Sequence, residues 1–380
     1  MNTNLAPTYK KLFGDHWILW YTISNSYSII EPEFKLLLDS YLESNSAIEF
    51  SSTISNSIDV SDDTTYSISE TLFNYLKDCN RPYSSPIIPL IPLDKSYRNI
   101  SKQYNFEGKT IQIYYNSELV LKTVHPALAY CCIKSSDVAL ATFDIYLKDE
   151  DLFLFKNERL ISRVSKHDYH LIQGKFIMQL LCTLHDKQES DWIGTFHGST
   201  ITDGNSSILF IGESGKGKST LCALLAANGF DLLADDVSPM LSKDKHIYYN
   251  PLAISIKKGA FNVLEPIVSN FDSLPLVKFN KTKGDLKYIP CEKPKNNHYP
   301  CHAIILVNYK PNADTSLEKV PVKTILETII PESWLSPNPK HAKQFLDWLT
   351  DIDMYQLTYS NTKSVTTEIS KLFKQLNKKL

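Results

Sequence analysis

Residues 212–220 read Gly-Glu-Ser-Gly-Lys-Gly-Lys-Ser-Thr, and this stretch decides the fold of the 380-residue chain. It matches the pattern G-x-x-x-x-G-K-[ST] at every fixed position. Glycines in such a loop let backbone N–H groups turn toward phosphates, and the helix that follows adds its positive dipole end. The stretch therefore predicts a site for a nucleoside triphosphate. We expect the contacts to come from Gly212, Ser214, Gly215, Lys216, Gly217, Lys218, Ser219 and Thr220.

The flanks of this loop have the pattern of a strand followed by a helix. Residues 206–211 predict a short buried strand, and residues 219–228 are rich in Ala and Leu and favour a helix. Gly229 then suits the end of that helix. In this setting Lys218 is expected to reach the terminal phosphates and the Ser219 hydroxyl to bind Mg²⁺. The predicted cofactors are ATP and Mg²⁺, although the motif does not distinguish ATP from GTP.

A second apolar run, residues 230–234, ends in the adjacent carboxylates Asp235 and Asp236. A carboxylate at a strand end that faces a phosphate loop holds Mg²⁺ in nucleotide sites. With two in a row, one can hold the metal with Ser219 while the other accepts a proton from an attacking hydroxyl. The sequence leaves open which carboxylate does which. Because side chains alternate along a strand, both can serve only if the chain bends here; the simpler alternative is a solvated turn.

His197 is the third element, followed at once by Gly198. The order of His-Gly, phosphate loop, one helix and then Ala-Asp-Asp resembles HPr kinase/phosphorylase and the related phosphoenolpyruvate carboxykinase-type nucleotide domain. The resemblance covers about half of the chain, from His-Gly to the C-terminus. It implies that His197, Asp235 and Asp236 surround the transferred phosphoryl group, beside Lys218 and Ser219.

The chain also departs from that family. Its loop ends Gly-Lys-Ser-Thr where HPr kinase has Gly-Lys-Ser-Glu, and the downstream Glu-x-Arg-Gly signature is absent. At the comparable distance, Lys257 or Lys258 can supply the positive charge that the missing Arg provides to phosphoryl oxygens. The alternative is that both lysines are simply solvated. These departures argue against HPr itself as the acceptor.

The first 81 residues have a different pattern. Residues 16–31 predict two strands around a polar turn, and residues 32–42 predict a helix. After a Ser-rich stretch, Ser67 and Glu70 form a capping-box pattern for a helix that runs through Leu76. This order resembles PqqD-like domains, which implies recognition of the leader of a ribosomally made, modified peptide as an added strand. The alternative is a cap that only shields the kinase domain.

The middle of the chain, residues 82–192, is expected to be β-rich. Pro82, Pro86, Pro89 and Pro92 predict an extended linker. Strands are predicted over 110–115, 138–147 and 152–155, followed by a helix over 172–184. Nearer the C-terminus we expect strands over 302–308 and 355–360 and a closing amphipathic helix over 362–380.

Two further groups of residues invite a functional interpretation. A lysine-rich stretch can clamp phosphates, although a solvated flexible loop is the expectation that we adopt. Its members are Lys278, Lys281, Lys283, Lys287, Lys293 and Lys295. The spacing of Cys291, His298, Cys301 and His302 fits no standard set of zinc ligands.

Bulk composition restricts the class of protein. A formal net charge of −2 argues against a general nucleic-acid binder, and seven cysteines suggest reduced thiols in the cytoplasm. The sequence has neither a signal-peptide pattern nor an apolar run long enough to span a membrane, and it leaves homo-oligomeric assembly open.

The predicted fold class is α/β and α+β multidomain: a phosphoenolpyruvate carboxykinase/HPr kinase-like nucleotide domain (193–380), preceded by a small winged-helix-like domain (1–81) and a β-rich middle part (82–192). The predicted activity is ATP-dependent phosphorylation of a Ser or Thr hydroxyl on a peptide or small protein, with Asp235, Asp236, His197 and Lys257 as catalytic residues. Two alternatives remain: phosphorylation of a small metabolite, and a non-transferring ATP-binding partner of a peptide-modifying enzyme.

Overall fold

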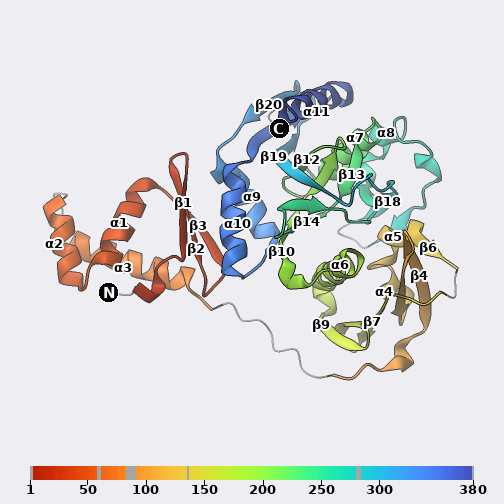
Figure 1. Cartoon of the computed structure of the whole chain (residues 1–380), viewed down its shortest axis with the longest axis horizontal. Helices are drawn as coiled ribbons and strands as arrows, with labels where there is room; N and C mark the ends of the chain where they lie inside the picture. The colour runs from red at the N-terminus through yellow and green to blue at the C-terminus, as the bar shows by residue number, and fades with distance from the viewer. Residues whose placement is uncertain (1–2, 58–60, 83–90, 135–136, 280–283, 379–380) are drawn as a thin grey trace. The chain divides into compact units, whose positions relative to one another are not determined.

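The structure is a computed structural model that describes residues 3–57, 61–82, 91–134, 137–279 and 284–378 (Figure 1). It is a mixed α/β fold with several sheets, as predicted, and it divides into two compact units. Unit 1 contains residues 1–85 and 319–354, and unit 2 contains residues 86–318 and 355–380. Residues 319–354 therefore belong to the unit formed by the N-terminal residues, although the predicted nucleotide domain, residues 193–380, includes them. The functional identities of the three predicted domains remain predictions.

Unit 1 is built on an antiparallel sheet with the order β1-β2-β3. Its core includes Leu19 and Tyr21 from β2 together with Leu38, Phe50 and Leu76 from three helices, all of them buried. The two predicted strands and the helix over 32–42 are confirmed. The elements are β1 (Tyr9–Phe13), β2 (His16–Tyr21), β3 (Ser26–Ile30), α1 (Pro32–Glu43), α2 (Ala47–Ser57), α3 (Asp62–Cys79), α9 (Val322–Glu332), β21 (Trp334–Leu335) and α10 (Pro339–Thr350).

The predicted capping box at Ser67 is wrong. The helix α3 begins six residues earlier, because the side chain of Ser61 accepts a hydrogen bond from the backbone N–H of Thr64. Ser67 lies inside the helix, where its carbonyl accepts from the Thr71 hydroxyl. A competing N-cap upstream thus satisfies the free N–H groups of the first turn before the chain reaches Ser67.

Unit 2 contains a six-stranded sheet with the order β6-β4-β5-β7-β8-β9, in which β5 and β7 are parallel. The helix α6 (Tyr169–His185) packs against β8 and β9. The predicted strands and helix of this region are confirmed; Pro86 and Pro89 of the predicted linker lie outside the described residues. The other elements are β4 (Ile100–Phe106), β5 (Lys109–Tyr115), α4 (Glu118–Leu121), α5 (His125–Leu128), β6 (Cys132–Ile133), β7 (Ala141–Lys148), β8 (Asp151–Lys156) and β9 (Arg159–Ser165).

The phosphate loop follows a strand of a second sheet of unit 2. The order of this sheet is β13-β11-β12-β19-β15-β14-β10, and β22 lies beside β19. The loop follows β12, which is parallel to β19 and antiparallel to β11. The strands are β10 (Trp192–His197), β11 (Ser199–Thr202), β12 (Ser207–Ile211), β13 (Asp231–Ala234), β14 (Val237–Leu241), β15 (His246–Tyr248), β19 (His298–Tyr309), β20 (Ser316–Lys319) and β22 (Asp353–Tyr359).

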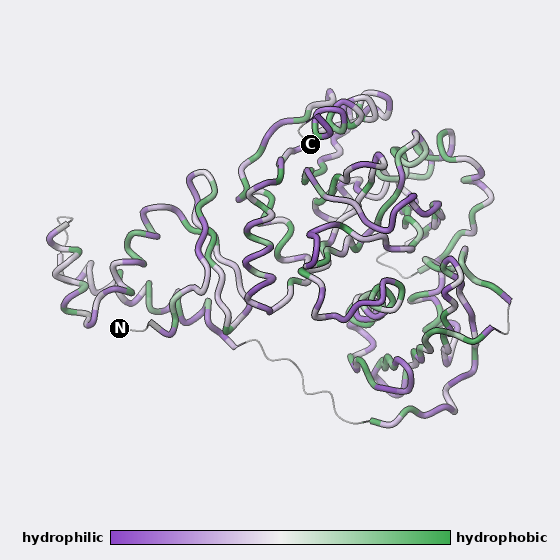
Figure 2. The backbone as a smooth tube through the Cα atoms, in the orientation of Figure 1, coloured by the Kyte–Doolittle hydropathy of each residue, from purple (hydrophilic) through white to green (hydrophobic). Residues whose placement is uncertain are grey.

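Two helices share a hydrophobic core with this sheet. Between β12 and β13, the chain forms α7 (Lys218–Ala226), and the closing helix α11 (Thr362–Leu376) packs against it. Hydrophobic and hydrophilic residues alternate along α11 (Figure 2), and its Val365 and Ile369 are buried in the same core as Phe210 of β12. The predicted strand–loop–helix setting and the closing helix are therefore confirmed.

The predicted lysine-rich loop is partly a small sheet, with the order β16-β18-β17. Lys287, on one of these strands, is held in place: its ammonium donates to the carbonyls of Phe271 and Asp272 and lies over two aromatic rings. Lys281 and Lys283 lie outside the described residues. The elements are β16 (Ile254–Lys257), α8 (Phe261–Leu264), β17 (Val277–Lys278) and β18 (Asp285–Ile289).

Among the described residues, no helix combines the length and the apolar character needed to cross a membrane. All seven cysteines lie in the described part of the chain, and each has a free thiol.

Candidate nucleotide-binding site

The phosphate loop depends on glycine at its two ends. Gly212 has a φ of 145°, and a Cβ there would lie 3.0 Å from the carbonyl oxygen of Val307 on β19. Gly217 caps α7 in the left-handed region, with a φ of 93°, and a Cβ there would lie 3.0 Å from the Tyr359 hydroxyl. Side chains at these two positions would meet both strain and close contacts. The fixed glycines of the motif thus have a steric reason in this structure.

Lys218 begins α7 and is directed back over the loop. Lys218 is 8% exposed, and its Nζ donates to the carbonyls of Gly212 (2.5 Å) and Glu213 (3.3 Å). The hydroxyl of Tyr359 donates to the Gly217 carbonyl at 3.4 Å and braces the loop from β22. The ammonium is therefore held where the predicted phosphate contacts are expected.

The remaining loop residues differ in exposure. Ser214, Gly215 and Lys216 are exposed at the tip of the loop, and Thr220 is half-buried in the first turn of α7. The Lys216 carbonyl accepts a backbone hydrogen bond from Tyr309, at the end of β19.

Asp235 is the buried centre of the site, at 1% exposed. Its Oδ1 accepts from the hydroxyls of Ser199 (2.6 Å) and Ser219 (3.0 Å), and its Oδ2 accepts from the backbone N–H of Ser255 (3.1 Å). Burial raises the pKa of the Asp235 carboxyl, and the neighbouring Asp236 raises it further, while the three donors oppose the rise. The loop serine and the carboxylate strand are thus in direct contact.

Asp236 sits at a bend in the chain. The strand β13 ends at Ala234 and β14 begins at Val237, while Asp236 has a left-handed φ of 66°. Its side chain is 58% exposed, and Oδ1 lies 3.3 Å from Nδ1 of His197. The predicted bend at the end of the strand is therefore present, and it leaves one carboxylate buried and the other exposed.

The pairing of strands brings His197 to Asp236. His197 ends β10 and lies opposite Val237 in the antiparallel pair β10–β14. The next residue must be glycine: a Cβ on Gly198 would lie 2.6 Å from the carbonyl oxygen of Phe210. The His-Gly pair thus reflects a close crossing of the chain over β12, beside the loop.

The structure separates the two candidate lysines. Nζ of Lys257, at the end of β16, lies 3.2 Å from Oγ of Ser214 at the loop tip. Nζ of Lys258 lies instead 3.4 Å from Oδ2 of Asp285. Lys257 alone of this pair is thus shown in contact with the phosphate loop.

Ser199 and Ser255 are site residues that sequence reasoning missed. Ser199 lies two residues after His197, on the strand β11 that pairs with β13, and this adjacency is the signal that points to it. Ser255 contributes a backbone N–H, for which the side-chain pattern gives no signal.

The donors around Asp235 fit Mg²⁺, which prefers oxygen ligands. The Ser219 hydroxyl and the Asp235 carboxylate are in contact, whereas the Asp236 carboxylate is paired with His197. Of the three predicted metal ligands, the structure thus joins two directly.

In the comparisons with known proteins, no family model and no curated protein matches this chain. Among solved structures, the chain is similar to the HPr(Ser) kinase/phosphatase from Coxiella burnetii. The two chains are 14% identical; the match covers 49% of this chain and 91% of the other, with a TM-score of 0.23.

Proposed function

We propose that the protein is an ATP-dependent kinase that transfers the γ-phosphate to a Ser or Thr hydroxyl of a peptide or small protein. The observation that carries the proposal is the His197–Asp236 pair, in which the carboxylate is exposed and the imidazole half-buried, next to the buried Asp235 that contacts Ser219 of the phosphate loop. An acid–base pair open to an acceptor, next to a loop that binds a triphosphate, is what phosphoryl transfer requires.

The buried half of the site would position the nucleotide. Ser219 and Asp235 would hold Mg²⁺, which supplies positive charge against the phosphate oxygens when bound. Lys218 would contact the terminal phosphates, and Lys257, already at the loop tip, would stabilise the charge of the transferred group.

The exposed half would activate the acceptor. Asp236 would take the proton from the hydroxyl while the hydroxyl oxygen bonds to the γ-phosphorus and the bond from that phosphorus to ADP breaks. Asp235 suits this role poorly because it is buried and its oxygens already accept three hydrogen bonds. His197 would orient the Asp236 carboxylate or the acceptor.

Unit 1 supports a peptide as the acceptor. Within its sheet, β1 and β3 are the edge strands, and each pairs only with β2 among the described residues. An edge strand can take an extended peptide as an additional strand. Hydrogen exchange on the full chain tests this directly: a bound substrate peptide is expected to protect the amides of β1 or β3, while unchanged exchange in both would argue for a simple cap.

The activity test uses [γ-³²P]ATP, Mg²⁺ and a library of peptides with one central Ser or Thr. We expect label in a subset of peptides with the wild type and a loss of labelling with Asp236→Asn, while ATP binding is retained. Equal labelling by both proteins contradicts the assignment. ATP hydrolysis without a labelled acceptor would support the non-transferring alternative.

A specific observation keeps a small metabolite as the second candidate acceptor. Unit 2 has a pocket lined by Tyr130, His185, Cys291 and Lys293. Burial raises the pKa of Cys291 to about 12, and the Asp235 carboxylate raises this pKa further. Labelling of free amino acids or sugars in the same assay, with no labelled peptide, would favour this alternative.

A further inference from the structure

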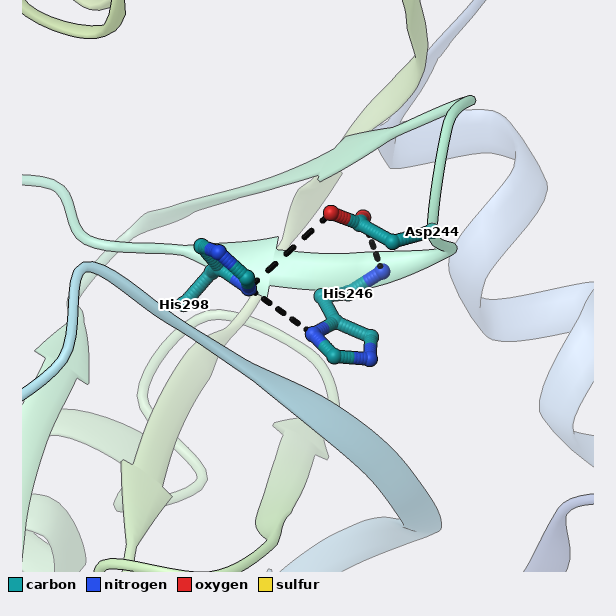
Figure 3. Close-up of side chains that lie close together, drawn as sticks. All are labelled: Asp244, His246 and His298. Carbon is teal, nitrogen blue, oxygen red and sulfur yellow. Dashed lines mark hydrogen bonds and ion pairs between the residues drawn. The ribbon is translucent and has the colours of Figure 1, made fainter.

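A cluster of metal-ligating side chains lies apart from the residues of the phosphate site. Its members are Asp244, His246 and His298, and Figure 3 shows the side chains together. Asp244 precedes β15, His246 is the first residue of β15, and His298 is the first residue of β19. In this antiparallel pair Tyr248 lies opposite His298 and His246 opposite Pro300, so the two histidines are diagonal neighbours on one face.

The ligand atoms of the three side chains converge. Nδ1 of His246 lies 2.8 Å from Nδ1 of His298, which lies 3.9 Å from Oδ2 of Asp244. One ligand atom from each residue can be chosen so that all three are within 4.8 Å of one another. Ligands of a tetrahedral Zn²⁺ with bonds of about 2.0–2.1 Å stand about 3.3 Å apart, so small side-chain movements suffice.

Neighbouring groups hold the carboxylate and one imidazole in place. The hydroxyl of Tyr248 donates to Oδ2 of Asp244 at 2.8 Å, and the backbone N–H of His246 donates to Oδ1 at 3.0 Å. The Tyr248 ring also stacks on the His298 ring, with centroids 4.5 Å apart. Supporting contacts of this kind orient the ligands of metal sites.

We propose that Asp244, His246 and His298 bind a divalent transition metal of the Zn²⁺ class. Two imidazoles and one carboxylate suit Zn²⁺ or Co²⁺, whereas Mg²⁺ prefers oxygen ligands alone. The histidines contact each other through Nδ1, so binding replaces a hydrogen bond between them, and both rings then carry their proton on Nε2. Three protein ligands leave a fourth position open, as in a tetrahedral site with an exchangeable ligand. His246 and His298 also line a surface pocket, together with Asn205 and Asn296.

This site is independent of the proposed kinase activity. It lies at the start of β19, whereas Tyr309 at the end of the same strand contacts the phosphate loop. The metal would join the turn before β15 to β19 and so tie two segments of unit 2 that are 52 residues apart in the chain. Of Cys291, His298, Cys301 and His302, whose spacing fits no standard set of zinc ligands, only His298 belongs to this cluster.

The test is a titration of the untagged, metal-stripped full chain with Co²⁺, followed by visible absorption and by metal analysis after dialysis against Zn²⁺. We expect one metal per chain. His298→Gln or Asp244→Asn should lower the affinity by at least about tenfold, and Tyr248→Phe, which removes only the supporting hydroxyl, by about 10–100-fold. His167→Gln, at an exposed histidine, is the matched control and should leave the affinity unchanged.

Two outcomes would overturn the proposal: wild type that binds neither Co²⁺ nor Zn²⁺, or His298→Gln and Asp244→Asn variants that both keep the wild-type affinity. A thermal melt with and without Zn²⁺ provides a second readout, since a ligand of the folded state raises the melting temperature. This rise should persist in Asp235→Asn and in His167→Gln and disappear in His298→Gln. A rise that disappears in Asp235→Asn alone would assign the metal to the phosphate site instead.

Discussion

Asp235 and Asp236 are adjacent in the chain, yet one belongs to the buried half of the site and the other to the exposed half. Asp235 is enclosed by Ser199, Ser219 and the backbone of Ser255, whereas Asp236 is turned toward solvent and His197. Asp236 itself has a left-handed backbone, and this bend gives the two side chains different surroundings. Burial and hydrogen bonding give these two identical side chains different chemistry, which under the proposed function would suit Asp235 to metal positioning and Asp236 to proton transfer.

The largest expected effect comes from the exposed half. Asp236→Asn should lower the rate of phosphate transfer by about 10²–10⁴, because a general base is lost while the isosteric amide keeps the shape. ATP affinity should remain within about threefold of wild type, since losing a base removes an interaction made only in the transition state. Single-turnover transfer of ³²P measures the rate, and a fluorescent-nucleotide titration measures the affinity. Equal losses in rate and affinity would contradict the separate roles of the two carboxylates.

The next effect concerns nucleotide binding by the buried half. Lys218→Met removes the ammonium that lies over the loop. It should weaken ATP binding by about 10–100-fold, because a hydrogen bond to a charged group contributes about 1.5–3 kcal/mol. Lys216→Met is the matched control: it removes an exposed ammonium but keeps the backbone N–H that the loop offers to phosphates, so it should change the affinity much less. Equal losses in the two variants would mean that charge near the loop, and not the position of Lys218, determines binding.

A smaller effect concerns the backbone that places His197. Gly198→Ala puts a methyl group 2.6 Å from the Phe210 carbonyl oxygen and should destabilise unit 2 by about 1–3 kcal/mol. Gly174→Ala, in α6 with open space around it, is the control and should be neutral or stabilising by up to about 1 kcal/mol. Denaturant unfolding measures both; a neutral Gly198→Ala would show that the crossing over β12 is looser than the structure has it.

The smallest effect is the pH dependence of stability. The pKa of the Asp235 carboxyl is raised in the folded state, so the folded protein binds this proton more tightly than the unfolded chain does. The resulting contribution to stability is fully present below the ordinary pKa of 3.8. It is lost as pH rises through the raised value. The melting temperature of Asp235→Asn, relative to wild type, should therefore increase with pH across this window. A constant difference between the two proteins would contradict the raised pKa.

Much of the candidate site could be predicted because its residues lie in short contiguous motifs. The loop, the Asp-Asp pair and the need for a bend between them follow from spacing and strand alternation. Ser199 and Ser255 were missed because strand pairing and a backbone N–H bring them to Asp235, and neither leaves a local pattern. Asp244, His246 and His298 were missed as a set for the same reason, since the β15–β19 register joins them.

The fold shows the same contrast. Strands and helices with clear periodicity were predicted correctly, including α6 and α11. The predicted start of α3 was wrong because Ser61 and Ser67 are both possible N-cap residues and sequence alone does not rank them. The membership of residues 319–354 in unit 1 depends on long-range packing, for which local sequence carries no signal.

The most direct test of the division between the two carboxylates is the Mg²⁺ dependence of phosphate transfer in Asp235→Asn and Asp236→Asn, each beside wild type. We predict that Asp235→Asn needs more Mg²⁺ and recovers part of its rate at saturating metal, because it weakens the site that holds the ion. Asp236→Asn should keep the wild-type Mg²⁺ requirement and remain slow at every concentration. Recovery of Asp236→Asn by Mg²⁺, with Asp235→Asn unresponsive, would contradict the account.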